Sequence, residues 1–204
     1  DTMQKKLYTI GYSGFKIDNF INTLKEHNIN IVIDVRSVPY SQYNVDYNKE
    51  YLEKILQYNN IYYRNYATEF GARQENKIYY PNGYLDFELF AKSKQFQTGI
   101  QKLEKTMQKN YKFILMCSEK DPIRCHRTIL VSRAFYNLGY QVIHLLTDKK
   151  ELTQADIEES LLNKYFPDRF QINMFSENLS NEEYINLAYK EQNKLIGYSI
   201  MEEL

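Results

Sequence analysis

Apolar residues in this chain occur either in short continuous runs or at helical spacing, and the two patterns alternate. The continuous runs predict strands that are buried on both faces. These runs cover 7–10, 31–35, 61–63, 112–117 and 141–146. Apolar positions three and four residues apart predict amphipathic helices. Those segments are 17–24, 49–58, 86–90, 96–107, 125–138, 153–162 and 181–191. The alternation predicts an α/β fold, with a mainly parallel sheet and helices on both faces.

Turn and capping residues mark several boundaries in this pattern. Gly139 predicts the end of the helix over 125–138. Thr153 with Asp156 predicts a capping box at the start of the next helix. The polar segment 66–84 predicts a long loop. We expect an α/β domain over 3–150, followed over 151–204 by a C-terminal helical and extended tail that packs on the domain in part.

Composition narrows the class of protein. A chain of 204 residues can bury a sizeable core. Lysine plus arginine equals aspartate plus glutamate at 26 each, so no overall positive field favours nucleic acid, although a local basic patch is compatible with this balance. Two cysteines do not make a secreted disulfide framework. No leader pattern or membrane-length apolar run is visible, and we expect a soluble, cytoplasmic protein.

The scarce reactive residues gather where the apolar run 112–117 ends. Both cysteines, Cys117 and Cys125, lie there with His126, which is one of three histidines. The same window contains the charged residues Glu119, Asp121, Arg124 and Arg127 beside Lys120. In an open α/β sheet, the carboxyl end of a strand and the start of the next helix form the usual ligand crevice. This segment is therefore the candidate site.

The sequence Cys125-His126-Arg127 places a thiol, an imidazole and a guanidinium in the first turn of a predicted helix. The helix dipole there binds anions and lowers the pKa of a thiol. We therefore expect Cys125 to be a nucleophile and His126 an acid or base. The alternative is a small buried Cys125 beside a satisfied core histidine.

The two loop carboxylates, Glu119 and Asp121, can act as a general acid or base or as cation ligands, and Glu119 is the candidate second acid or orienting group. Ion pairs of Glu119 and Asp121 with Arg124 and Arg127 are the favoured alternative, since loop carboxylates beside arginines usually pair with them.

Two further strand ends are predicted to reach the same crevice. The turn Gly11-Tyr12-Ser13-Gly14 can hold a phosphate or carboxylate with its backbone amides, although it is neither a dinucleotide fingerprint nor a P-loop. Asp34 is expected to orient its loop, while Arg36 reaches the ligand. We expect Tyr12, Ser13 and Arg36 to bind the ligand together with Cys117, Arg124 and Arg127.

The two thiols leave other functions open. Cys117 and Cys125 can form a redox pair, bind a soft metal with His126 or His144, or stay apart. The spacing fits neither paired zinc ligands nor a thioredoxin-like motif. No metal site is therefore predicted and no cofactor is named, and a metal or thiol redox sensor is one alternative function. His144 lies inside a predicted strand and is expected to be a core histidine, with a supporting role at the site.

The tail contains a short peptide pattern. Gln171-Ile172-Asn173-Met174-Phe175 resembles the peptide that binds the bacterial sliding clamp. In such peptides an extended chain presents a glutamine and apolar anchors, here Gln171, Ile172, Met174 and Phe175. The alternative is a tail strand that packs Ile172, Met174 and Phe175 on the domain. Clamp binding would make the protein a non-catalytic adaptor in DNA repair or replication.

Three ordered motifs resemble a bacterial family, domain of unknown function 488. They are Thr9-Ile-Gly-Tyr-Ser13, then Asp34-Val-Arg36 with Pro39 and Ser41, then Cys117-x-Glu119 followed by Cys125-His-Arg127. The resemblance covers roughly 7–146, and the tail through Gly197-Tyr198 resembles the longer members. Where the family pattern has a glycine pair, this chain has Phe70-Gly71-Ala72-Arg73. The resemblance implies a fold and a site, and no established reaction.

These observations lead to one main hypothesis. We expect an enzyme that binds an anionic, phosphate-bearing ligand, such as a nucleotide or a nucleic-acid end, at Cys117–Arg127. No membrane partner is expected.

Overall fold

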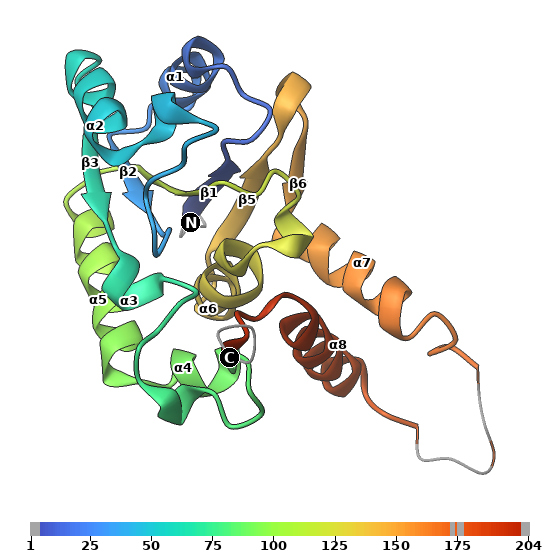
Figure 1. The fold of residues 1–204 in the computed structure, drawn as a ribbon. Coiled ribbons are helices and arrows are strands. Elements are labelled where there is room, and N and C mark those ends of the chain that lie inside the picture. The colour runs from blue at the N-terminus through green and yellow to red at the C-terminus, as the bar shows by residue number, and fades with distance from the viewer. Residues whose placement is uncertain (1–4, 172–173, 175–177, 201–204) are drawn as a thin grey trace.

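The computed structural model describes residues 5–171, 174 and 178–200. Within this part of the chain, six strands form one sheet in the order β3-β2-β4-β1-β5-β6. Figure 1 labels β3, β2, β1, β5 and β6. The strands are β1 (Lys6–Gly11), β2 (Ile31–Asp34), β3 (Tyr62–Asn65), β4 (Phe113–Cys117), β5 (Gln141–Leu145) and β6 (Glu151–Thr153). β6 is antiparallel to β5, and all other neighbours are parallel. The predicted α/β fold with a mainly parallel sheet is confirmed.

The helices follow the predicted periodicity closely. They are α1 (Ile17–Glu26), α2 (Lys49–Tyr58), α3 (Ala67–Phe70), α4 (Phe87–Ala91), α5 (Lys94–Gln108), α6 (Arg133–Asn137), α7 (Gln154–Tyr165) and α8 (Asn181–Ile196). Short 3-10 turns lie at Val45–Tyr47, Lys77–Tyr79, Pro122–Arg124 and Thr147–Lys149. The predicted long loop over 66–84 is interrupted by two short helical segments, α3 and one 3-10 turn. Both are too short to show a helical period.

Alternate strand residues build one core on each face of the sheet, because side chains in a strand point to opposite faces in turn. Ile33 and Leu115 face the core that contains α4 to α8. Val32 and Ile114 face the core that contains α1 and α2. The helices on both faces thus cover strands that are apolar on both sides, as continuous apolar runs predict.

The strand register brings the candidate residues to one edge. β4 lies between β1 and β2, with Gly11 level with Cys117 and Asp34 level with Met116. Because the three strands are parallel, their carboxyl ends meet at this edge, and Tyr12, Val35 and Ser118 follow there. The predicted convergence of three strand ends is confirmed.

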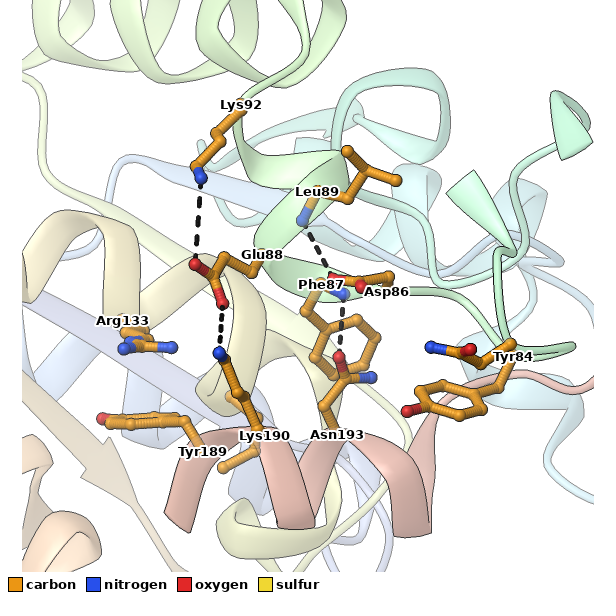
Figure 2. Close-up of a pocket in the computed structure, with 12 residues that line it drawn as sticks. Tyr84, Asp86, Phe87, Glu88, Leu89, Lys92, Arg133, Tyr189, Lys190 and Asn193 are labelled. Carbon is orange, nitrogen blue, oxygen red and sulfur yellow. Dashed lines mark hydrogen bonds and ion pairs between the residues drawn. The ribbon is translucent and has the colours of Figure 1, made fainter. Parts of the chain in front are cut away.

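The C-terminal helices lie next to each other on the side of the molecule that carries β6 (Figure 1). The predicted capping box starts α7: Thr153 Oγ1 accepts from the Asp156 amide at 3.1 Å, and the Asp156 carboxylate accepts from the Thr153 amide at 2.8 Å. α8 joins α4 through Asn193, which accepts from the Phe87 amide at 2.9 Å (Figure 2) and donates to the Leu85 carbonyl at 2.8 Å. No helix in the described ranges has the length and apolar character needed to cross a bilayer.

Candidate functional site

A cavity of about 480 Å³ opens at the carboxyl ends of β1, β2 and β4. Eight of the predicted site residues line it, namely Tyr12, Ser13, Arg36, Cys117, Glu119, Arg124, Cys125 and His126. Arg127 lies outside this lining and is fully buried, at 0% exposure. The structure thus brings together the residues that the sequence placed at one site, with the guanidinium of Arg127 next to the two thiols.

Arg127 has an unusual set of partners for a buried arginine. Its Nη1 donates to the carbonyl oxygen of Glu119 at 2.6 Å and to the Cys117 sulfur at 3.1 Å. Its Nε donates to Thr9 Oγ1 at 3.2 Å. Among the described residues no carboxylate pairs with Arg127, and its Nη2 has no partner that accepts a hydrogen bond in good geometry. The positive charge therefore faces the sulfurs.

The two thiols differ in acidity because they share these surroundings. Burial raises the pKa of Cys117 well above its ordinary value, and the contact with Cys125 raises it further. Burial also acts to raise the pKa of Cys125, but the Cys117 thiol and the charge, side chain and backbone amide of Arg127 outweigh it and lower that pKa to about 7. Of the two thiols, Cys125 is therefore the more acidic.

His126 is oriented by the neighbouring strand end. Its Nε2 lies 2.9 Å from the carbonyl oxygen of Val35, so this nitrogen carries the hydrogen and donates it. Burial, foremost, lowers the pKa of His126, and the imidazole is neutral near pH 7. Its Nδ1 is then a lone-pair acceptor 3.9 Å from the Cys125 sulfur. This arrangement fits a general base.

The helix begins slightly later than predicted. Cys125 has extended backbone angles, and its carbonyl oxygen accepts from the amides of Thr128 and Ile129 at 3.0 and 3.1 Å. It is therefore the residue that caps the helix and does not lie in its first turn. The helix opens as a π-helix over Arg127–Ser132, in which Ser132 Oγ donates to the Arg127 carbonyl at 2.6 Å. Such wide turns occur frequently at functional sites.

The ion pairs predicted for the loop carboxylates are wrong. The Glu119 carboxylate accepts from the Asp121 amide at 3.1 Å, and the Asp121 carboxylate accepts from the Ile123 amide at 3.2 Å. Both side chains therefore shape the loop. It is the backbone carbonyl of Glu119, and not its side chain, that binds Arg127. In the described part of the chain Arg124 has no ion pair, and it lines the cavity as an exposed cation.

Arg36 and Asp34 form a buried pair. The Arg36 Nη2 and Nε donate to the two Asp34 oxygens at 2.9 and 3.0 Å. Asp34 also accepts from the Arg36 amide at 3.0 Å and from the Tyr63 hydroxyl at 2.5 Å. Asp34 thus orients its loop as predicted. Arg36 lines the cavity, but its charge is balanced by Asp34, and it also donates to the Tyr12 hydroxyl at 3.3 Å and the Tyr47 carbonyl at 2.8 Å.

The turn after β1 does not offer the amides that the sequence predicted for an anion. The Tyr12 amide donates to the Cys117 carbonyl at 2.9 Å, and the Ser13 amide donates to the Ser118 carbonyl at 3.0 Å. The parallel pairing of β1 with β4 continues past the strand ends and uses both donors. That part of the prediction is wrong, and the Ser13 side chain remains at the cavity wall.

A family comparison matches residues 16–134 with the family described as Domain of unknown function DUF488. The chain belongs to the DUF488 family. The match covers more than half of the chain and includes Asp34, Arg36 and the whole segment from Cys117 to Arg127. A comparison with curated proteins finds no match.

Several site residues of this DUF488 protein were not predicted. Ser37, Tyr40, Tyr43 and Arg73 line the cavity, and Tyr43 is 86% exposed. Arg73 lies over the ring of Tyr198, with the guanidinium carbon 4.8 Å from the ring centroid. These residues come from loops with no periodicity. The sequence could have indicated Tyr40 and Tyr43, because both follow the end of the second predicted strand within a few residues.

His144 is a fully buried core histidine, as predicted. Its Nδ1 lies 2.6 Å from Thr9 Oγ1, and Thr9 in turn contacts Arg127. Burial, foremost, lowers the pKa of His144 to about 3, and the imidazole stays neutral. Both cysteines are free thiols. The described residues contain no group of three histidine, cysteine or acidic side chains that could hold a metal ion.

A second hollow of about 410 Å³ lies between α4 and α8 (Figure 2) and contains none of the predicted site residues. Its charged side chains contact one another: Glu88 lies 3.8 Å from both Lys92 and Lys190. The guanidinium of Arg133 lies over the ring of Tyr189 at 4.0 Å. This hollow shares no lining residue with the candidate cavity.

The predicted clamp-binding peptide lies partly outside the described residues. Ile172, Asn173 and Phe175 belong to the segments that the structure does not describe. Gln171 is exposed and Met174 is 87% exposed, in the connection between α7 and α8. Met174 therefore does not pack on the domain.

Proposed function

We propose that this DUF488 protein is a cysteine-dependent enzyme whose Cys125 thiolate attacks a phosphate-bearing anionic ligand. The observation that carries the proposal is the buried guanidinium of Arg127, which contacts thiols and, within the described residues, no carboxylate. Arginine stays charged in proteins, and a buried charge without a counter-charge is costly. A thiolate supplies that counter-charge, and a thiolate is the reactive form of cysteine.

The neighbouring groups complete a nucleophilic site. Cys125 lines the cavity, and the Nδ1 of His126 faces its sulfur at 3.9 Å. When Cys125 is protonated, Nδ1 accepts its proton. The sulfur then forms a bond to phosphorus, the bond from phosphorus to the leaving oxygen breaks, and His126 returns the proton to that oxygen. A water molecule then forms a bond to phosphorus and gives a proton to His126 Nδ1, while the sulfur–phosphorus bond breaks and Cys125 leaves as the thiolate.

The cavity wall favours an anion that carries an aromatic group. Arg73 and Arg124 are exposed cations at the wall, and Ser13 adds a hydroxyl. The rings of Tyr40 and Tyr43 at the rim are 51% and 86% exposed, which suits stacking on a nucleobase. A nucleotide or a nucleic-acid end therefore fits the cavity better than a free phosphate. Arg36 supports the wall through its pair with Asp34.

The thiolate is tested by alkylation with iodoacetamide between pH 5 and 9. We expect the rate at Cys125, followed by mass spectrometry, to rise with pH around an inflection near 7, because the pKa of Cys125 is lowered to about 7. Cys117 is expected to stay unmodified, since its pKa is raised well above the ordinary value. Turnover of p-nitrophenyl phosphate should fall roughly a hundredfold or more in Cys125→Ser and in His126→Ala. An inflection above pH 8.5, or turnover that both variants retain, would end the proposal.

A second candidate function is favoured by the exposed tail connection. We propose that the peptide Gln171–Phe175 binds a bacterial sliding clamp, because Gln171 is exposed and Met174 is 87% exposed. Isothermal titration with a purified clamp should show micromolar binding that Phe175→Ala abolishes. Phe170→Ala is the matched control, since Phe170 is 80% exposed and lies outside the peptide. No binding of the unaltered protein at micromolar concentration, or equal binding by both variants, would rule it out.

A further inference from the structure

A chain of buried hydrogen bonds leads from Arg127 away from the cavity. Arg127 Nε lies 3.2 Å from Thr9 Oγ1, which lies 2.6 Å from Nδ1 of His144. Nε2 of His144 lies 2.7 Å from Oε1 of Gln154 at the start of α7. The side chains of Thr9, His144 and Gln154 are all at 0% exposure. Thr9 and His144 are level with each other in the neighbouring strands β1 and β5.

The donors and acceptors in this chain fix its direction. The guanidinium of Arg127 can only donate hydrogen bonds, so Thr9 Oγ1 accepts from it. The Thr9 hydroxyl then donates its own hydrogen to His144 Nδ1. A neutral His144 then carries its hydrogen on Nε2 and donates it to the carbonyl oxygen of the Gln154 side chain. The opposite tautomer would place two acceptors against each other, Nε2 of His144 and Oε1 of Gln154.

The series of hydrogen bonds continues into the C-terminal helices α7 and α8. Gln154 Nε2 donates to the Thr128 carbonyl at 3.2 Å and to the Tyr189 hydroxyl of α8 at 3.0 Å. The Tyr189 hydroxyl donates to the Glu158 carboxylate of α7 at 2.8 Å. Every link therefore has one donor and one acceptor, from the site to the edge of the protein.

We propose that Thr9, His144 and Gln154 are positioning residues, which hold the guanidinium of Arg127 against the two thiols. A buried N–H without an acceptor is costly, so Thr9 fixes where the Nε edge of Arg127 lies, and Glu119 fixes the opposite edge. The inference rests on the proposed function, because the held guanidinium stabilises the Cys125 thiolate. It adds that segments outside the matched range 16–134 complete the site, since Thr9, His144, Gln154 and Tyr189 all lie there.

The other titratable or charged groups around Cys125 include Cys117, His126, Glu119 and Arg124, which line the same cavity. The Thr9 hydroxyl bonds to none of these four, because its partners are His144 and Arg127. A change in the ionisation of Cys125 on altering Thr9 therefore reports on Arg127, to which the Thr9 hydroxyl is bonded.

The test compares three variants of the full chain by the pH profile of Cys125 alkylation with iodoacetamide. In Thr9→Val the inflection should rise by about one pH unit, and the rate at pH 7 should fall about fivefold, because the guanidinium is no longer held. Thr9→Ser keeps the hydroxyl and should restore the original profile. Thr128→Val is the matched control: Thr128 is equally buried, but its hydroxyl has no hydrogen-bond partner. It should leave the profile unchanged.

The outcomes separate the two proposals. If the unaltered protein shows no inflection near 7, the proposed function fails. The positioning role is overturned if the unaltered protein shows the inflection near 7 and Thr9→Val has the same inflection. It is also overturned if Thr128→Val raises the inflection as much as Thr9→Val does. Should Thr9→Val not fold, nitrogen-15 NMR of the unaltered protein decides. We expect His144 to be the neutral Nε2–H tautomer from pH 5 to 9. The opposite tautomer or a protonated ring would contradict the proposed series of hydrogen bonds.

Discussion

Gly11→Ala is expected to destabilise the protein by about 3 kcal/mol or more, because overpacking a rigid site costs roughly 1–3 kcal/mol and here no flexible group can yield. An added Cβ would lie 1.7 Å from the carbonyl oxygen of Glu119 and 2.5 Å from its carbonyl carbon. It would also lie 3.0 Å from Nη1 of Arg127. The Glu119 carbonyl that binds Arg127 would have to move away.

Urea unfolding followed by circular dichroism measures this loss of stability. Gly139→Ala is the control, because its Cβ would meet nothing within 4 Å although its φ of +96° favours glycine. That conformation costs roughly 1–2 kcal/mol for a residue with a side chain. Gly11→Ala should therefore be the more damaging change. Equal stability of Gly11→Ala and the unaltered protein would show that the contact between β1 and the 118–120 loop is not tight.

The strands and most helices follow from the sequence because their signals are local. Continuous apolar runs become β2 and β4, and the repeat around Ile100 becomes α5. The edge strand β6 was missed, because three residues of mixed exposure give no period. The π-helix was missed as well. Its hydrogen bonds join residues five apart, but this local change leaves no distinct pattern of apolar residues in the sequence.

The candidate site was located from the sequence, but its chemistry was not. The sequence shows that Cys125, His126 and Arg127 are consecutive. It cannot show that a carbonyl of Glu119 and a hydroxyl of Thr9, 118 positions away, bind the guanidinium. Backbone acceptors carry no side-chain signal, and for the same reason the amides of Tyr12 and Ser13 were assigned wrongly to an anion. Which arginine is balanced by a carboxylate depends on packing: Arg36 is balanced, and Arg127 is not.

Arg127→Met tests the central claim most directly. Methionine fills similar space without a charge, so the Cys125 thiolate loses its counter-charge and its pKa should return upward. We expect the alkylation rate of Cys125 at pH 7 to fall roughly tenfold or more, since a free cysteine with a pKa near 8.5 is only a few per cent ionised there. Arg133→Met is the control, because Arg133 lies in the same helical segment but lines the second hollow and not the candidate cavity.

The stability of the same variant should depend on pH in a defined direction. In the unaltered protein the pKa of Cys125 is lowered from an ordinary value of 9.0 to about 7. The unfolded chain thus binds more protons at Cys125 between these values, and the contribution of Cys125 to stability is fully present above pH 9 and is lost as pH falls through 7. Two pH units correspond to roughly 2–3 kcal/mol at about 1.4 kcal/mol per unit.

In Arg127→Met this increase with pH should disappear. The loss of the bonds to Thr9 and Glu119 costs about the same at every pH, roughly 1–3 kcal/mol. The gap between the variant and the unaltered protein should therefore widen from pH 6 to pH 9, as urea unfolding at both values would measure. A gap that stays constant would mean that Arg127 is a structural cation with no thiolate beside it. A widening gap, together with slow alkylation, can arise only if the arginine and the thiolate stabilise each other.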